Sequence, residues 1–414
     1  MLPMSLLRYV AAAALSACGA WAAQAPNPIP PAGVSTRALP NGGLVVVRRD
    51  ASAPLCVVDL WIRAGATDDG GTGAAHAVEH MVFKGSTPGI DDALEAAGIV
   101  AYAATLADAT HYLATAPADK APLVARTLCR VLNAPRIDPA AWELERRVML
   151  EESERSRTDA VAEVRRALSA RLFGSVYGAP VAGSPEALKA LGGAGIAAFH
   201  RRWYRADRAI LVVAGNVDAA AAMDGAVAAL SAVKAEGDSP KDIPVPAAVG
   251  PVEAAVIRDD GSAAGLAWPV DGADAAALEV LCEVLRSRLP GRMGGVARVV
   301  SVSHPWQRAA LLAIVAQGSF TDGEPVIAAL RKAVAAATLG ITASDVAAAA
   351  RRSRWSWWLD HETPAEQGRA LGLGAALGDV QRASLEPERL NAVTLADVRE
   401  AAERLTGPPA SAPR

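Results

Sequence analysis

The segment that decides the fold is GAAHAVEHMVFKG, residues 73–85. On a helix, His76 and His80 lie one turn apart on the same face, so their imidazoles can bind one metal ion. Glu79 lies on nearly the same face, where its carboxylate can reach a water beside that metal. The order His-x-x-Glu-His is the inverted form of a common zinc motif. Small and apolar flanking residues predict a packed helix, in which unpaired histidines would be costly.

A catalytic zinc ion usually has three protein ligands and one open position. Residues 143–152 are predicted to form a helix whose inward face carries Glu145 and Glu152, seven residues apart. Glu151 is turned about 100° away and has an arginine four residues before and after it, which indicates a solvated face. We therefore predict Glu152 as the third ligand and Glu145 as a group that orients a histidine. The alternative is that these glutamates are exposed helix formers.

Taken together, these segments resemble the pitrilysin/insulinase family of zinc peptidases, in its bacterial two-domain, processing-peptidase-like branch. Further residues that match are Gly98, Thr105, Asp108, Thr110, Tyr112, Phe199, Tyr204 and the segment 210–218. The resemblance implies an α+β fold of two homologous half-domains. Each would be a mainly antiparallel sheet with helices packed on one face, and the halves would form a clamshell.

The resemblance also implies an activity. The chain would be a zinc-dependent endopeptidase with one Zn²⁺ per chain, held by His76, His80 and Glu152, and with Glu79 as the catalytic base. Its substrates would be unfolded peptides in an enclosed chamber. Its partner would be a second copy or a zinc-less homologous subunit. The rival interpretation is a catalytically silent scaffold or assembly subunit that keeps the fold, and the intact motif argues against it.

Three residues are candidates for substrate binding, and they lie at two places where the chain departs from the family pattern. Where relatives carry an Asn-Ala pair on the strand before Thr105, this chain has Tyr102 and Ala103. Arg292 corresponds to an arginine that grips the substrate backbone, but no tyrosine follows it at the family's distance. We therefore expect a partner chain to contribute to substrate binding.

Composition limits the class of protein. The chain has 414 residues, of which 52% are hydrophobic and 21% charged, so it is globular. The net charge of −3 argues against nucleic-acid binding. Cys56, Cys129 and Cys282 each lie in an apolar segment and are predicted core residues. Strands are expected at residues 44–47, 58–62, 101–112, 210–214 and 265–268, and helices at 121–132, 140–172 and 275–289.

Residues 1–23 are predicted to be a secretory signal, because a short apolar stretch follows Arg8. Two cleavage sites remain open. One is a lipobox that ends before Cys18 and leaves a lipid anchor there, and the other is the A-x-A sequence at residues 20–22. Either predicts a periplasmic or exported protein, attached to a membrane only through that anchor. The remaining boundaries are a zinc-bearing half at 24–235, a linker at 236–250, a non-catalytic half at 251–408 and a tail at 409–414.

Overall fold

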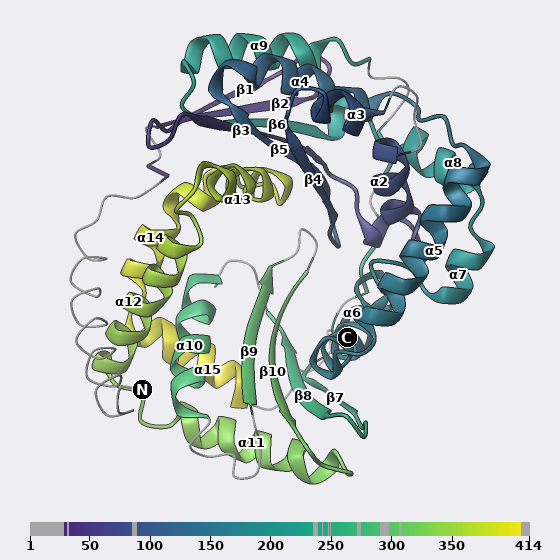
Figure 1. Ribbon diagram of the computed structural model, residues 1–414. Coiled ribbons are helices and arrows are strands. Elements are labelled where there is room, and N and C mark those ends of the chain that lie inside the picture. The colour runs from purple at the N-terminus through teal and green to yellow at the C-terminus, as the bar shows by residue number, and fades with distance from the viewer. Residues whose placement is uncertain are drawn as a thin grey trace, which may run out of the picture.

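The computed structural model has an α+β architecture with two sheets, which confirms the predicted fold class (Figure 1). It describes residues 29–30, 33–84, 89–234, 239–241, 243–246, 248, 250–270, 275–289, 298–305 and 309–406. The two sheets, each with its helices, lie on opposite sides of a central space, and helices border that space on both flanks.

The first sheet has six strands in the order β1-β2-β6-β3-β5-β4. Its members are β1 (Val34–Ala38), β2 (Leu44–Arg49), β3 (Leu55–Ile62), β4 (Val100–Thr105), β5 (Thr110–Pro117) and β6 (Ala209–Gly215). All neighbours are antiparallel except β2 and β6. The single strand expected at residues 101–112 is a hairpin of β4 and β5 instead, so β4 lies at an edge of the sheet. That edge is free to pair with another extended segment.

Eight helices accompany this sheet in the described part of the chain. They are α2 (Ala74–Lys84), α3 (Ile90–Glu95), α4 (Ala121–Cys129), α5 (Pro139–Ser156), α6 (Ala160–Gly178), α7 (Pro185–Ala190), α8 (Gly193–Trp203) and α9 (Ala219–Ser231). The single helix expected at residues 140–172 is two helices, α5 and α6. The reason is local, because the Asp159 carboxylate accepts hydrogen bonds from the backbone N–H groups of Val161 and Ala162 and so begins a new helix.

The second sheet has four antiparallel strands in the order β7-β8-β10-β9. These are β7 (Val252–Val256), β8 (Ser262–Pro269), β9 (Arg298–Pro305) and β10 (Ala310–Gly318). The helices of this half are α10 (Ala275–Arg288), α11 (Glu324–Thr338), α12 (Ala343–Leu359), α13 (Pro364–Ala376), α14 (Arg382–Ala392) and α15 (Leu395–Thr406). Its core includes Leu266, Leu281, Ile314 and Leu330.

The two halves exchange one helix each across the molecule (Figure 1). Helix α13 of the second half packs on β3 and β6 of the first sheet, and α6 of the first half packs on β7, β8 and β10. In the sequence of β3, Val58, Leu60 and Ile62 alternate with Asp59 and Trp61, a pattern that predicts a strand with one packed face. Both faces are buried, because α13 covers the side of Asp59 and Trp61, which are 0% exposed.

Gly372 lies where α13 meets the first sheet. A Cβ atom added there would lie 2.0 Å from Nε1 of the buried Trp61, closer than any packed contact. We expect Gly372→Ala to lower the free energy of unfolding by about 1–3 kcal/mol through overpacking, measured by urea denaturation. The matched control is Gly225→Ala in α9, whose added Cβ would have no heavy atom within 4 Å. That change should raise stability by about 0.5–1 kcal/mol. Equal behaviour of the two variants would contradict this packing.

Several predictions fall on residues that the structure does not describe. The signal segment with Cys18, Arg292, the tail and part of the linker are all outside the described ranges. Within them, Cys56, Cys129 and Cys282 are buried, as core residues would be. No single helix of the described residues meets the length and hydropathy needed to cross a membrane, whereas α11 and α12 meet it jointly across a bend of 110°.

Candidate metal centre

Helix α2 begins at a loop that leaves little freedom to its backbone. Gly73 has a φ of +76°, and a Cβ there would lie 2.8 Å from the carbonyl oxygen of Ala182, so only glycine fits. The Asp69 carboxylate accepts hydrogen bonds from the backbone N–H groups of Gly71 at 2.7 Å and Ala75 at 3.2 Å. Burial raises the pKa of Asp69 to about 6. These contacts fix the start of α2 and therefore the direction of its polar face.

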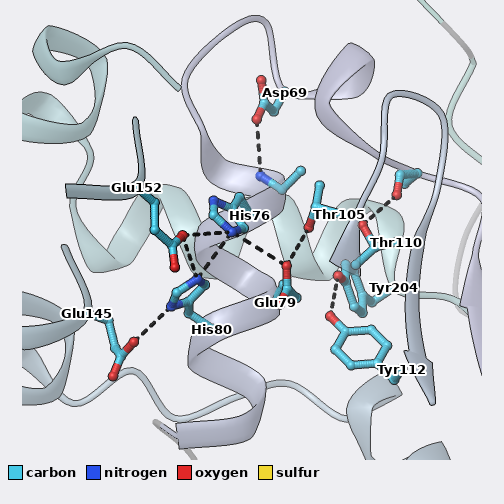
Figure 2. A network of polar contacts seen from close by, with 12 residues as sticks. Asp69, His76, Glu79, His80, Thr105, Thr110, Tyr112, Glu145, Glu152 and Tyr204 are labelled. Carbon is cyan, nitrogen blue, oxygen red and sulfur yellow. Dashed lines mark hydrogen bonds and ion pairs between the residues drawn. The ribbon is translucent and has the colours of Figure 1, made fainter. Parts of the chain in front are cut away.

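His76 and His80 face each other from successive turns of α2 (Figure 2). Their Nε2 atoms are 3.2 Å apart and their rings are nearly perpendicular, at 87°. Burial, together with a smaller effect of the neighbouring His80, lowers the pKa of His76 to about 4. His76 is therefore neutral at neutral pH, which leaves a nitrogen lone pair available to a metal.

Glu145 on α5 fixes the orientation of His80. Its Oε2 atom lies 2.8 Å from Nδ1 of His80, and its side chain is only 6% exposed. Because an ionised carboxylate can only accept, Nδ1–H of His80 donates this bond, and the lone pair lies on Nε2. The structure thus places Glu145 where the sequence predicted a residue that orients a histidine (Figure 2).

Glu152 lies two turns further along α5 and points at both rings (Figure 2). Its Oε2 atom is 3.6 Å from Nε2 of His76 and 3.8 Å from Nε2 of His80. The side chain is 40% exposed, so the centre opens on this side to the interior of the molecule. Glu151, in contrast, is exposed, as its helical position predicted.

These three residues fit a zinc ion. Among the described residues, they are the group of histidine and acidic side chains whose ligand atoms converge, all within 4.8 Å of one another. In a tetrahedral zinc site, bonds of about 2.0–2.2 Å place neighbouring ligand atoms about 3.3–3.5 Å apart. The observed separations of 3.2, 3.6 and 3.8 Å surround that value. With a lone pair on each Nε2 atom, the two rings and the carboxylate would present three ligand atoms to a cation between them.

Glu79 lies beside this triad on α2. Its Oε2 atom is 3.7 Å from Nε2 of His76 and accepts a hydrogen bond of 3.0 Å from Oγ1 of Thr105 on β4. Burial raises the pKa of Glu79, while His80 and the Thr105 bond oppose this shift. Thr105 matches the family pattern, but no function was predicted for it from the sequence. Its contact identifies it as the side chain that orients the Glu79 carboxylate.

Other polar contacts near Glu79 could not be read from local sequence. The hydroxyl groups of Tyr112 on β5 and Tyr204 lie 2.7 Å apart (Figure 2), and both are buried. Burial raises the pKa of Tyr112 well above its usual value. Both tyrosines matched the family pattern, yet their contact joins residues 92 positions apart.

The substrate-binding candidates divide between the described and undescribed parts of the chain. Tyr102 and Ala103 lie on edge strand β4, with Tyr102 57% exposed. Arg292 lies outside the described residues. A cavity of about 710 Å³ adjoins the centre and includes His76, Glu152 and Thr105 in its wall. Residues of both halves line it, including Val176 of α6, Leu311 of β10 and Leu373 of α13, so a substrate bound there would contact both halves.

Comparison with known sequences then decides the family. The sequence model of insulinase (peptidase family M16) matches residues 44–183, and that of the peptidase M16 inactive domain matches residues 194–352. The chain belongs to the M16 (insulinase) family of peptidases. The metal-binding candidates of this M16 chain all lie in the first matched segment. The second segment carries the name of a domain without activity.

Three curated relatives each match less than half of this M16 chain. A zinc protease of Mycobacterium bovis, named uncharacterized, is 34% identical over 191 residues, 44% of this chain and 43% of that protein. The beta subunit of the mitochondrial-processing peptidase of Blastocladiella emersonii is 30% identical over 187 residues, 44% of this chain and 40% of that protein. Subunit 1 of the cytochrome b-c1 complex of Bos taurus is 29% identical over 185 residues, which are 43% of this chain and 38% of that protein. These matches span less than half of each relative.

Solved structures resemble the M16 chain over most of its length. A protease from Helicobacter pylori has a TM-score of 0.78 at 18% identity and covers 89% of this chain and 96% of its own. A peptidase M16 inactive domain from Pseudomonas fluorescens has a TM-score of 0.75 at 18% identity, with coverage of 90% and 94%. These likenesses establish the arrangement of two half-domains.

Proposed function

We propose that the chain is a zinc-dependent endopeptidase that hydrolyses unfolded peptides. The observation that carries this proposal is the convergence of His76, His80 and Glu152, with Glu79 beside them. A zinc ion held there would polarise the scissile carbonyl and lower the pKa of an attacking water to about 7. The names of the relatives as zinc proteases and as a processing peptidase support the same reaction.

The chain's own residues supply proton transfer and positioning. Glu79 takes a proton from the attacking water and later gives it to the leaving amine. Thr105 holds the carboxylate in place through its 3.0 Å hydrogen bond. Burial raises the pKa of Glu79 and so makes it a stronger base than an exposed glutamate. An extended peptide would add to the free edge of β4, close to Thr105.

The proposal includes a partner and a location. A second copy, or a zinc-less homologous chain, would contribute substrate contacts. Support comes from relatives named as subunits of larger assemblies. We also propose export to the periplasm, on the apolar N-terminal sequence, with Cys18 as the site of a lipid anchor if the lipobox is used.

Zinc removal tests the enzymatic proposal directly. The purified chain, alone and with a zinc-less homologue from the same source, is incubated with a quenched fluorescent unfolded peptide. Cleavage should cease after treatment with 1,10-phenanthroline and return when one equivalent of zinc is added. Cleavage that persists in fully metal-free protein would contradict the proposal.

A catalytically silent assembly subunit is the second candidate. It is favoured by one comparison, the 29% identity to subunit 1 of the cytochrome b-c1 complex. In that case the chain would bind a partner stably and cleave no peptide with zinc bound. The zinc-dependent cleavage assay distinguishes the two candidates.

A further inference from the structure

Edge strand β4 presents different residues to the two sides of the first sheet. Thr105 faces α2, where it contacts Glu79, and Ala101 and Ala103 pack against the core on that side. By the alternation of a strand, Tyr102 faces the opposite side, on which α13 covers the neighbouring strands β3 and β6. With 57% of its surface exposed, Tyr102 is accessible to a peptide that pairs with β4.

A row of stacked rings connects Tyr102 to the interior of the protein. His111 on β5 lies opposite Ala104 of β4 and opposite Trp61 of β3. Its ring stacks on Trp61, with centroids 4.3 Å apart and planes at 18°. Tyr102 meets the same imidazole edge to face at 5.9 Å and 65°. Since Gly372 of α13 lies against Trp61, the row runs from that helix to the sheet edge.

A buried carboxylate fixes the central ring of this row. Oδ1 and Oδ2 of Asp59 lie 3.1 and 3.3 Å from Nδ1 of His111, and these residues are 0% and 2% exposed. The carboxylate accepts this bond, so the imidazole is held in one tautomer and one orientation. A polar pair at a site otherwise lined by apolar residues costs free energy unless it is hydrogen-bonded. The hydrogen-bonded pair of Asp59 and His111 therefore holds the imidazole ring as a rigid surface under Tyr102.

We propose that this row of rings makes the chain select peptides with an aromatic side chain, and that Tyr102 is the contact. The proposal rests on the proposed peptidase function, because it requires a peptide on β4. Thr105 is the residue of β4 that contacts Glu79, and Tyr102 is three residues away from it along the strand. The selected residue therefore lies about three positions from the bond that is cut, on the Tyr102 side of the pairing. Aromatic cross-strand pairs are among the favourable ones.

Peptide binding tests this without requiring turnover. Zinc-loaded protein with Glu79→Gln is titrated with labelled unstructured decapeptides that carry Phe, Leu or Ala at one varied position. We expect one position at which Phe binds about three- to tenfold more tightly than Ala. Tyr102→Ala should abolish that preference. The matched control is Val100→Ala, on the same strand and the same side and 82% exposed, which should retain it.

A second pair of variants tests the supporting residues. Asp59→Asn keeps an acceptor for His111 and should retain the preference, whereas His111→Ala should reduce it while leaving the affinity for the Ala peptide unchanged. Thermal melting checks that these buried variants fold, and the exposed Tyr102 variant decides the question if they do not. An aromatic preference that survives Tyr102→Ala, or no preference at any position, overturns the inference.

The same peptides, incubated with the wild-type chain and zinc, separate the two proposals. Cleavage without a Tyr102-dependent preference overturns the inference and leaves the peptidase function standing. A Tyr102-dependent preference in binding, with no peptide cut by the chain either alone or with a zinc-less homologue, supports the inference and contradicts the peptidase function.

Discussion

Glu79→Gln is expected to abolish peptide cleavage while zinc remains bound. Glutamine preserves the shape of the side chain and can still receive the Thr105 hydrogen bond on its carbonyl oxygen. It cannot accept a proton from water at neutral pH. Loss of general acid–base catalysis typically costs a factor of about 10²–10⁴ in rate. Turnover of a quenched peptide and zinc content by mass spectrometry, measured on the same preparation, provide the two readouts.

Glu95→Gln is the matched control for this substitution. Glu95 is exposed on the neighbouring helix α3, and the same change of charge there should leave both turnover and zinc content unchanged. Turnover by the Glu79 variant within tenfold of wild type would show that another group is the base.

Glu152→Gln is expected to have the second large effect, and it acts on the metal. Glu152 supplies a carboxylate ligand beside the two imidazoles, with its Oε2 atom 3.6 and 3.8 Å from their Nε2 atoms. A neutral amide oxygen binds zinc far more weakly than a carboxylate, so we expect at least a 100-fold loss of zinc affinity and a matching loss of cleavage at limiting zinc. Competition with a chromophoric chelator measures the affinity.

The neighbouring residue offers an internal control. Glu151→Gln changes the same charge on the same helix, but Glu151 is exposed and lies outside the converging group. It should bind zinc as the wild type does. Equal losses in the two variants would indicate a general effect on α5 and would contradict a direct bond from Glu152.

Local pattern identified the candidate residues of the centre because they belong to two helices. The spacing of His76, Glu79 and His80 specifies one face of α2, and the spacing of Glu145 and Glu152 specifies one face of α5. Whether α5 would lie against α2 was not a local property, and the resemblance to a family supplied it. The structure brings these side chains together.

Features that depend on pairing between distant segments escaped prediction. Helix α13 of the second half covers the second side of β3, although the alternation of this strand indicated one packed side. The turn between β4 and β5 has no glycine or proline. It is held by Asp108, which accepts hydrogen bonds from Tyr177 and Thr67 far along the chain. The contact of Asp59 with His111 likewise requires the register of β3 with β5.

Zinc binding by His76, His80 and Glu152 is tested most simply by an anomalous difference map at the zinc absorption edge, from crystals of the zinc-loaded chain. If His76, His80 and Glu152 bind zinc, the map will show one strong peak per chain, about 2.0–2.2 Å from Nε2 of His76, Nε2 of His80 and a carboxylate oxygen of Glu152. A chain saturated with zinc that shows its peak elsewhere, or shows Glu152 turned away from an ion held by other groups, would contradict it.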